Sequence, residues 1–507
     1  MNPVIPLPEI VIERDGSALA ADAVIALGEV YVHQTLSRPT LCELAFRDPP
    51  GPLTVDSLLQ PGTMIRVLVG GQRIPLFKGQ VTAVEYRYEP SGGREVRVRA
   101  YDLLHRLRKN GTVRAHVQVT LDDLAQEFAA PHGLRLQSHE SAPLMQYVIQ
   151  HHQSDLELLQ QLAQRVGLYF SVREDSLHIF SLSGIDGEAL TLRLGETLLE
   201  AQFEINADSV VGEVAATGWD SARIETHSGR VSSARSGRSV YASVAAGDVG
   251  GSGARSLVNL GVEDALQVEA LAQSELDHRE AREVVLNGTA QGDTRLRPGA
   301  SVNAVDVASS VAGTYVLTTA THRISEQVGY ITEITSAPPP RRERPRGTIA
   351  APGVVTQIDD PERLGRVRVS LPSFENVNTD WINVVTIGAG AGKGLMIQPD
   401  VNDDVLVLLA HEDPAQAVVV GGLYGPNGTP DAGIEDGAVR RYTLLTPGKQ
   451  RVTLDDSGQV IRLENSDGSF VELSPQKVRV HAERDLEIEA PGKAIVIRGN
   501  TIDFERG

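Results

Sequence analysis

The sequence has few of the residues on which several classes of function depend. Cys42 is the only cysteine, so an intrachain disulfide and a multi-cysteine zinc or iron–sulfur site are excluded. Aromatic residues make up 4% of the chain, which argues against a stacking surface for bases or sugars. The 47 Lys and Arg residues are outnumbered by 66 Asp and Glu residues, and the net charge of -19 argues against binding to nucleic acid or anionic lipid.

Long hydrophobic runs are also absent. No apolar stretch approaches the roughly 18 residues that a transmembrane helix needs, and residues 1–10 lack the basic start and apolar run of a signal peptide. We therefore expect no signal peptide and a product that is made soluble in the cytoplasm. Hydrophobic residues nevertheless reach 41%, enough for a buried core, and alternating Val, Thr and Arg residues favour a mainly β fold.

Two breaks divide the chain. Three consecutive prolines in 337–346 are typical of a semi-rigid linker, and residues 424–437 are rich in turn formers. We predict domains at 1–336, 347–427 and 428–507, with the Pro/Arg linker at 337–346.

The first domain is predicted to be α+β. Strand alternation occurs at 64–69, 95–99 and 315–319. Helices are predicted after Thr120 and after Ser154, because each begins a capping box with an acidic residue three positions later. A third helix is predicted at about 262–282, where apolar residues recur at helical spacing.

Residues 347–427 are predicted to contain strands only. Short β-rich runs occur at 365–370, 381–385, 404–409 and 417–420. Several short strands within about 80 residues suit a small closed barrel such as an OB-fold.

The last segment repeats a short strand and a tight turn. Apolar pairs two residues apart recur with a period of about eight residues, and charged residues such as Arg462, Glu472 and Arg479 stand beside them, where we expect them to face water. A lone strip of this kind would expose its edges and its apolar side chains, whereas three intertwined copies would bury both. We therefore predict a homotrimeric needle. Its core residues are Val452, Leu454, Ile461, Leu463, Val471, Leu473, Val478, Val480, Leu486, Ile488, Ile495, Ile497, Ile502 and Phe504.

The motifs also carry a family resemblance that spans most of the chain. Residues 150–167 and 177–180 resemble the hub helix and following strand of VgrG-like spike proteins, and residues 381–394, 399–408 and 419–425 resemble the OB-domain signature of that family. The family comprises type VI secretion spikes, phage baseplate hub–spike proteins and phage-tail-like extracellular particles.

The resemblance implies a hub of two barrel subdomains with inserted helices, an OB-fold barrel and a C-terminal triple-stranded β-helix spike. The hub would adapt a hexameric inner tube to a threefold needle, which pierces the target envelope when a sheath contracts. The implied partners are two further copies of the chain, the inner tube protein and other baseplate proteins, with a membrane contacted only on piercing. The protein would be cytoplasmic during assembly and then part of an injection particle.

Three departures from the family pattern matter. The chain ends at Gly507 directly after the last repeat, so we expect no appended effector; there is no room for a lysozyme before the needle, and no paired His-x-His lies near its end. A separate PAAR-type tip protein is therefore expected to contact Phe504 and Gly507. These departures favour an extracellular particle over a phage or a type VI system.

Motifs that suggest chemistry have simpler interpretations. Residues 388–394 are glycine-rich around Lys393 but depart from the phosphate-loop pattern, so we interpret them as a barrel loop. His151 and His152 precede a helix cap and are interpreted as structural, and His411 is expected to make surface hydrogen bonds.

We expect no catalytic residues, cofactor or metal. Motifs of serine, zinc and cysteine hydrolases are absent from the sequence. The alternative functions are an envelope-degrading enzyme, which would hydrolyse peptidoglycan or polysaccharide, and a tail protein that binds glycans or a receptor.

Overall fold

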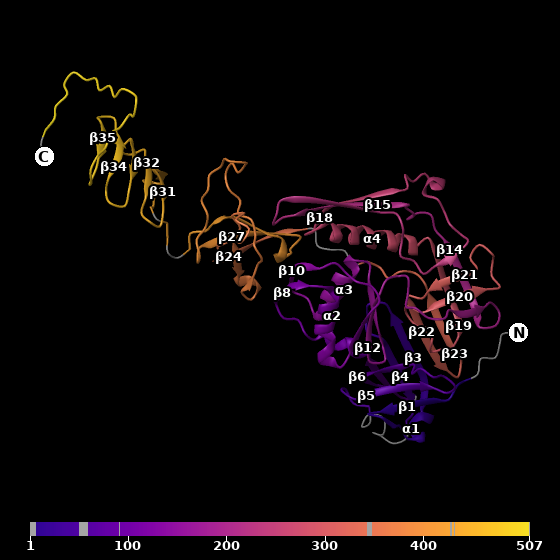
Figure 1. Cartoon of the computed structure of the whole chain (residues 1–507). Coiled ribbons are helices and arrows are strands. Elements are labelled where there is room, and N and C mark those ends of the chain that lie inside the picture. The colour runs from indigo at the N-terminus through magenta and orange to yellow at the C-terminus, as the bar shows by residue number, and fades with distance from the viewer. Residues whose placement is uncertain are drawn as a thin grey trace. The chain divides into compact units, whose positions relative to one another are not determined.

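The computed structural model describes residues 7–49, 59–90, 92–341, 347–425, 428–429 and 431–505 (Figure 1). The chain forms two compact units, Met1–Leu423 and Tyr424–Gly507. Both are mostly β structure, as predicted. The finer boundaries at 336, 346 and 427 stay predictions, and residues 342–346 of the predicted linker lie outside the described residues.

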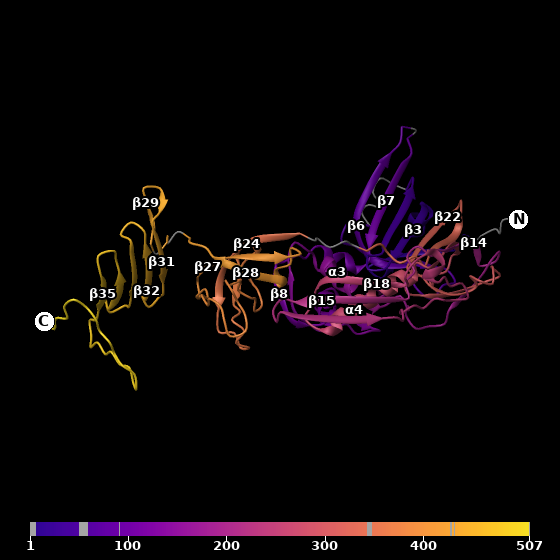
Figure 2. The same cartoon turned by 90° about the horizontal axis from the view of Figure 1, so that it is seen from above.

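The largest sheet of the first unit has 11 strands, which come from both early and late parts of the sequence. Its strands alternate between buried and less buried positions, as in Met64–Val69, where Ile65, Val67 and Val69 face the core. The order along the sheet is β14 (Leu198–Ile205), β19 (Val284–Gln291), β23 (Gly329–Thr335), β22 (Thr319–Ser325), β3 (Leu27–Thr35), β4 (Leu41–Arg47), β7 (Arg94–Tyr101), β6 (Phe77–Tyr88), β5 (Met64–Val69), β1 (Ile10–Arg14) and β2 (Ser17–Ala18). Figure 2 shows the β6–β7 hairpin projecting from this unit.

An early strand and a late strand meet in the middle of this sheet. β3 pairs with β22 in antiparallel register from Glu29 with Ser325 to Thr35 with Thr319. Side chains reinforce the pairing, because the Thr35 and Thr319 hydroxyls lie 2.8 Å apart. The two ends of the first predicted domain are thereby held together.

The predicted capping boxes begin two helices. α2 (Leu121–Ala129) starts at Thr120, whose side chain accepts from the Asp123 backbone, and α3 (Asp155–Arg165) starts at Ser154 in the same way. α3 ends before Gly167, whose φ of 69° is a left-handed conformation that favours glycine. Both helices bury their apolar faces in one core with η1 (Leu103–Arg108).

The third predicted helix is α4 (Ala265–Ala281), which Asp264 caps. It lies along a three-stranded sheet of β16 (Glu225–Val231), β15 (Glu213–Asp220) and β18 (Ala254–Gly261), as both views show (Figures 1 and 2). Val268, Ala272 and Leu276 pack against this sheet.

Smaller elements complete the first 341 residues. The remaining strands are β8 (Arg114–Val119), β9 (Arg135–Ser138), β10 (Met145–Gln150), β11 (Tyr169–Arg173), β12 (Ser176–Phe180), β13 (Leu190–Arg193), β17 (Ser239–Val240), β20 (Ser301–Val305) and β21 (Gly313–Val316). The remaining helical turns are α1 (Ala21–Ile25), η2 (Ala130–His132) and η3 (Ala246–Val249).

Residues 348–422 form a small barrel. Its sheet runs β26 (Val377–Asn378), β25 (Arg368–Leu371), β24 (Thr348–Gln357), β27 (Asp404–Ala410) and β28 (Ala417–Gly422), with short turns η4 (Pro372–Phe374) and η5 (Pro414–Gln416). The prediction of a regular strand at 381–385 is wrong. Ile382 instead pairs with Val367 and Val384 with Val419 through single bridges, and these bridges close the barrel between its two sides.

The second unit is an antiparallel β-meander, in which strands that follow each other along the chain pair with each other. β29 (Ile434–Glu435) and β30 (Ala438–Val439) pair with each other, and the five-stranded sheet runs β31 (Arg441–Leu445), β32 (Arg451–Asp455), β33 (Val460–Glu464), β34 (Phe470–Leu473) and β35 (Val478–His481). The predicted turns at 456–458, 466–468 and 475–477 separate these strands. Residues 482–505 form no strand, contrary to the predicted repeat, because nothing else in the described part of the single chain pairs with them.

Candidate assembly surface

The sheet β31–β35 separates its side chains by polarity. Antiparallel register places Leu454 opposite Ile461, and Leu463 opposite Val471. Because alternate residues of a strand point to opposite faces, all apolar partners of these pairs gather on one side. We call this side the apolar face: Tyr442, Leu444, Val452, Leu454, Ile461, Leu463, Val471, Leu473, Val478 and Val480.

The opposite face is polar and internally paired. Arg462 lies 2.9 Å from Glu464 and 3.0 Å from Glu472, and its guanidinium stacks 3.8 Å from the centre of the Phe470 ring. Hydrogen bonding to Glu464 raises the pKa of Arg462. Arg479 covers the same ring at 5.3 Å. This face is satisfied within one chain and suits contact with water.

The apolar face is largely uncovered. Leu463 is 57% exposed, Val478 69% and Val480 57%, whereas Val452 and Val471 are half-buried by their neighbours. Single exposed apolar residues are common on proteins, but a contiguous set on adjacent strands marks an interaction surface. The eight predicted core residues from Val452 to Val480 therefore lie together, as their spacing predicted.

Sequence reasoning missed two members of this face. Tyr442 and Leu444 on β31 pair with Leu454 and Val452. They are 59% and 47% exposed, and their spacing of two residues is the same signal that identified the others.

The predicted core continues beyond β35 without a sheet. Leu486, Ile488, Ile495, Ile497 and Ile502 are each about half exposed or more. Phe504 is 92% exposed, and Gly507, its predicted companion in a tip contact, lies outside the described residues. Their roles in a needle core and at a tip stay predictions.

A second apolar surface lies on the barrel. Ile387 and Met396 are 79% and 80% exposed. Both lie on the loop between β27 and the residues Ile382 and Val384, whose bridges close the barrel. The glycine-rich residues 388–394 form its tip, where Gly390 and Lys393 exchange two backbone hydrogen bonds of 3.1 Å. No helix follows this turn within the described loop, so the interpretation as a barrel loop is confirmed.

The paired histidines contact the barrel. The two ring nitrogens of His151 lie 3.2 Å from the Ile149 carbonyl oxygen and 3.0 Å from the Glu412 carbonyl oxygen. His151 and His152 both pack edge-on against Phe374 of η4. These contacts support their structural interpretation. His411 stands in the turn after β27 with φ 55°, and its ring makes no hydrogen bond to another described residue.

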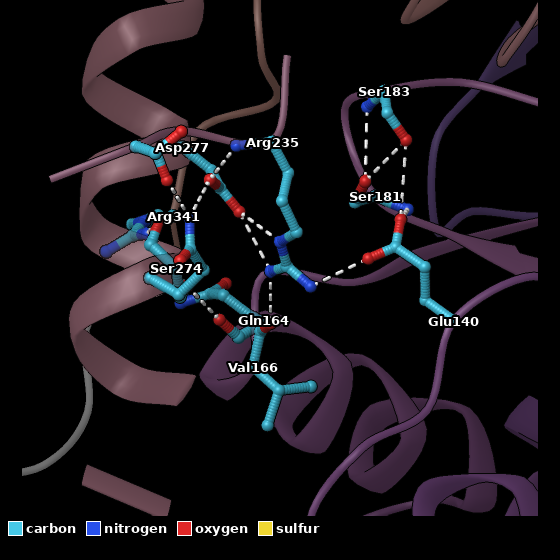
Figure 3. A network of polar contacts seen from close by, with 11 residues as sticks. Glu140, Gln164, Val166, Ser181, Ser183, Arg235, Ser274, Asp277 and Arg341 are labelled. Carbon is cyan, nitrogen blue, oxygen red and sulfur yellow. Dashed lines mark hydrogen bonds and ion pairs between the residues drawn. The ribbon is translucent and has the colours of Figure 1, made fainter. Parts of the chain in front are cut away.

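A buried polar network ties the first unit together around Arg235 (Figure 3). Its guanidinium donates to Asp277, to Glu140 and to the Val166 carbonyl oxygen, each at 2.8 Å. Burial raises the pKa of Asp277, and Arg235 opposes that change. The network joins α4, the end of α3 and the segment before β10.

The same helix holds the start of the predicted linker. Arg341 donates to the Ser274 hydroxyl at 2.9 Å and to Glu275 at 2.6 Å. The Ser274 hydroxyl in turn donates to the Gln164 carbonyl oxygen at 2.8 Å (Figure 3). The chain therefore leaves the first predicted domain from a fixed point on α4.

Reactive sites are usually built from clustered titratable side chains. Among the described residues, no three His, Cys, Asp or Glu side chains gather as metal ligands. His139 and His178 are stacked with ring nitrogens 3.1 Å apart, and burial lowers the pKa of His178 to about 4. Cys42 is buried, which raises its thiol pKa. No described helix has the length and apolar character to cross a membrane.

Comparisons with known proteins agree with the fold. Residues 351–424 match the type VI secretion system/phage-baseplate injector OB domain. A chain of the Francisella PdpA–VgrG complex superposes with a TM-score of 0.55 at 10% identity, covering 95% of this chain and 89% of that one. The E. coli c3393 protein, a type VI secretion component with structural similarity to the T4 phage tail proteins gp27 and gp5, superposes with a TM-score of 0.54 at 14% identity, covering 82% and 99%.

The resemblance to VgrG-like spike proteins is thereby confirmed for the fold and for the OB domain. No curated protein matches the sequence. Residues 7–326, more than half of the chain, match the Alg8 N-terminal domain. The chain therefore belongs to the family of the Alg8 N-terminal domain, and with its injector OB domain it is a VgrG-like component of a phage baseplate or type VI secretion apparatus.

Proposed function

We propose that this protein is the homotrimeric central spike of a contractile injection particle. The observation that carries the proposal is the contrast between the two faces of the sheet β31–β35. One face is paired through Arg462, Glu464 and Glu472, and the other exposes a contiguous set of apolar side chains. Three sheets packed by their apolar faces would enclose that set and leave the charged faces in water.

The residues after β35 extend the same proposal. Ile488 and Ile497 are 67% and 64% exposed and have no strand partner within the described chain. Winding around two further copies would supply hydrogen bonds to their backbone and cover their side chains. A needle built in this way resists local unfolding, because each strand is held from both sides by another chain.

The remaining parts of the proposal follow from the family. The first unit would form the threefold hub that receives a hexameric inner tube, and the exposed barrel loop around Ile387 would contribute to a collar of three barrels. A small tip protein would cover Phe504 and Gly507. On sheath contraction the needle would be driven through the target envelope, so the role is mechanical rather than enzymatic.

Native mass spectrometry of the full chain tests the proposal. We expect a species of three times 54.5 kDa at micromolar concentration. The Ile497→Asp variant should lose that species, because it places three carboxylates in the core. The adjacent Arg498→Asp variant should keep it, because Arg498 is predicted to face water. A monomeric wild-type chain, or an intact Ile497→Asp trimer, would contradict the needle.

A further inference from the structure

A pocket in the first unit gathers arginine side chains from distant parts of the sequence. Arg38 comes from the turn between β3 and β4, Arg173 from the end of β11, and Arg297 from the loop before β20. The pocket has a volume of about 600 Å³ including its solvent-filled mouth, and residues 74–78 line another side. We call it the arginine pocket.

These guanidinium groups form no ion pair with another described residue. Arg173 donates to the Pro298 carbonyl oxygen at 3.0 Å, but its buried Nε has no partner. No described carboxylate lies within ion-pair distance of Arg38, Arg173 or Arg297. Burial, and then the charge of Arg297, lower the pKa of Arg173 to about 9; burial also lowers the pKa of Arg297, although the charge of Glu174 opposes that change.

Two nearby carboxylates, those of Asp102 and Asp175, are engaged by other groups. Both oxygens of Asp102, which lines the pocket, accept backbone N–H groups, at 2.8 and 3.1 Å. Asp175 is paired with Lys78 at 2.6 Å. Glu174 also lines the pocket and its charge opposes the lowering of the Arg297 pKa, but it is exposed to solvent and forms no ion pair with these arginines among the described contacts. The pocket therefore has a net excess of positive charge.

A buried hydroxyl adds a further unused donor. The Ser171 side chain lines the pocket, is 9% exposed as a residue, and its Oγ has no hydrogen-bond partner. Buried donors without acceptors are rare in folded proteins and call for an explanation. Here the unused donors belong to Ser171 and Arg173, two positions apart on β11, and both residues line the same pocket.

We propose that the arginine pocket binds a single oxyanion, either a free phosphate or a carboxylate of another protein subunit. Planar guanidinium groups match both in geometry, and an oxyanion would accept from the Arg173 Nε and the Ser171 hydroxyl together. The chain itself carries 66 Asp and Glu residues, so a neighbouring copy is a source of the carboxylate. The bound anion would fix β11 against the loop before β20.

Thermal unfolding and titration calorimetry of the full chain test this site. The probes are inorganic phosphate and glutarate, each compared with sodium chloride of equal ionic strength. We expect saturable binding of at least one probe and a higher unfolding temperature with it. The Arg173→Gln and Arg297→Gln variants should weaken that binding roughly tenfold or more, as loss of a charge-assisted pair does.

Two further variants keep the test decisive. Arg38→Gln changes an exposed mouth residue, so it should fold normally and still bind the probe more weakly. Arg230→Gln changes a 69% exposed arginine on β16 and should bind like the wild type. Preference for phosphate identifies a free anion, and preference for glutarate identifies a carboxylate. Equal behaviour of both probes and chloride, or probe binding unaffected by all three pocket variants, would overturn the proposal. None of these readouts depends on trimer formation.

Discussion

The Leu463→Asp substitution separates the lone chain from the proposed trimer. Leu463 lies on β33 at the centre of the apolar face, between Val452 on β32 and Val471 on β34. In the single chain its side chain is 57% exposed. An aspartate there would stay hydrated, so the free energy of unfolding of the sheet should change by only about 0.5 kcal/mol.

In a trimer the same substitution should strongly weaken association of the three chains. Full burial of a leucine is worth about 1.5–3 kcal/mol, and about half of that remains to be gained here. Each buried carboxylate adds a desolvation penalty of several kcal/mol. The trimer contains the substitution three times, so the total loss of association free energy is on the order of 10 kcal/mol. At about 1.4 kcal/mol for each factor of ten, association should weaken by roughly seven orders of magnitude.

Size-exclusion chromatography with light scattering measures this effect. The wild type should elute as a trimer and Leu463→Asp as a monomer with unchanged β content by circular dichroism. Thr453→Asp is the matched control, since Thr453 lies opposite Arg462 on the polar face and its carboxylate would remain in water. The reasoning is refuted if Leu463→Asp stays trimeric at micromolar concentration, or if Thr453→Asp dissociates equally.

Two further predictions concern the first unit. Arg235→Met leaves the carboxylate of Asp277, which is 1% exposed, without its cation, so unfolding in urea should show a loss of about 3–5 kcal/mol; stability equal to the wild type would show that the network is dispensable. Burial lowers the pKa of His278 and His322 to about 4, below the unfolded value of about 6.5. Each histidine is therefore neutral in both states above pH 6.5, where the folded state has its full stability. As the pH falls toward 4, the unfolded state takes up the proton first, and about 3 kcal/mol of folding stability is lost for each histidine. The His322→Gln variant should show a shallower loss of stability over that range than the wild type, and parallel curves would contradict the assignment.

Local signals in the sequence predicted the local parts of the fold. The capping box at Ser154 places the start of α3 correctly, because the cap and its partner are three residues apart. Alternation placed the strands of the apolar face, since the period of two fixes which side chains share a face. These features depend on neighbours along the chain.

Features that depend on distant residues were not predictable in this way. The Arg235 network draws Asp277 from 42 residues away and Glu140 from 95 residues away, and nothing in the local pattern pairs them. The arginine pocket likewise combines arginines from three separate segments. The segment 381–385 has the residues of a strand, but barrel closure reduces it to single bridges at Ile382 and Val384.

The pairing of β3 with β22 has a consequence for synthesis on the ribosome. His33 and Thr321, which meet across these strands, are 288 residues apart. At about 5–20 residues per second, the edge of β3 emerges roughly 15–60 s before its partner. During that interval nascent chains on one polysome would present identical open edges to each other. Slower translation or lost chaperone capacity should therefore reduce the yield of this protein before any mature particle is affected.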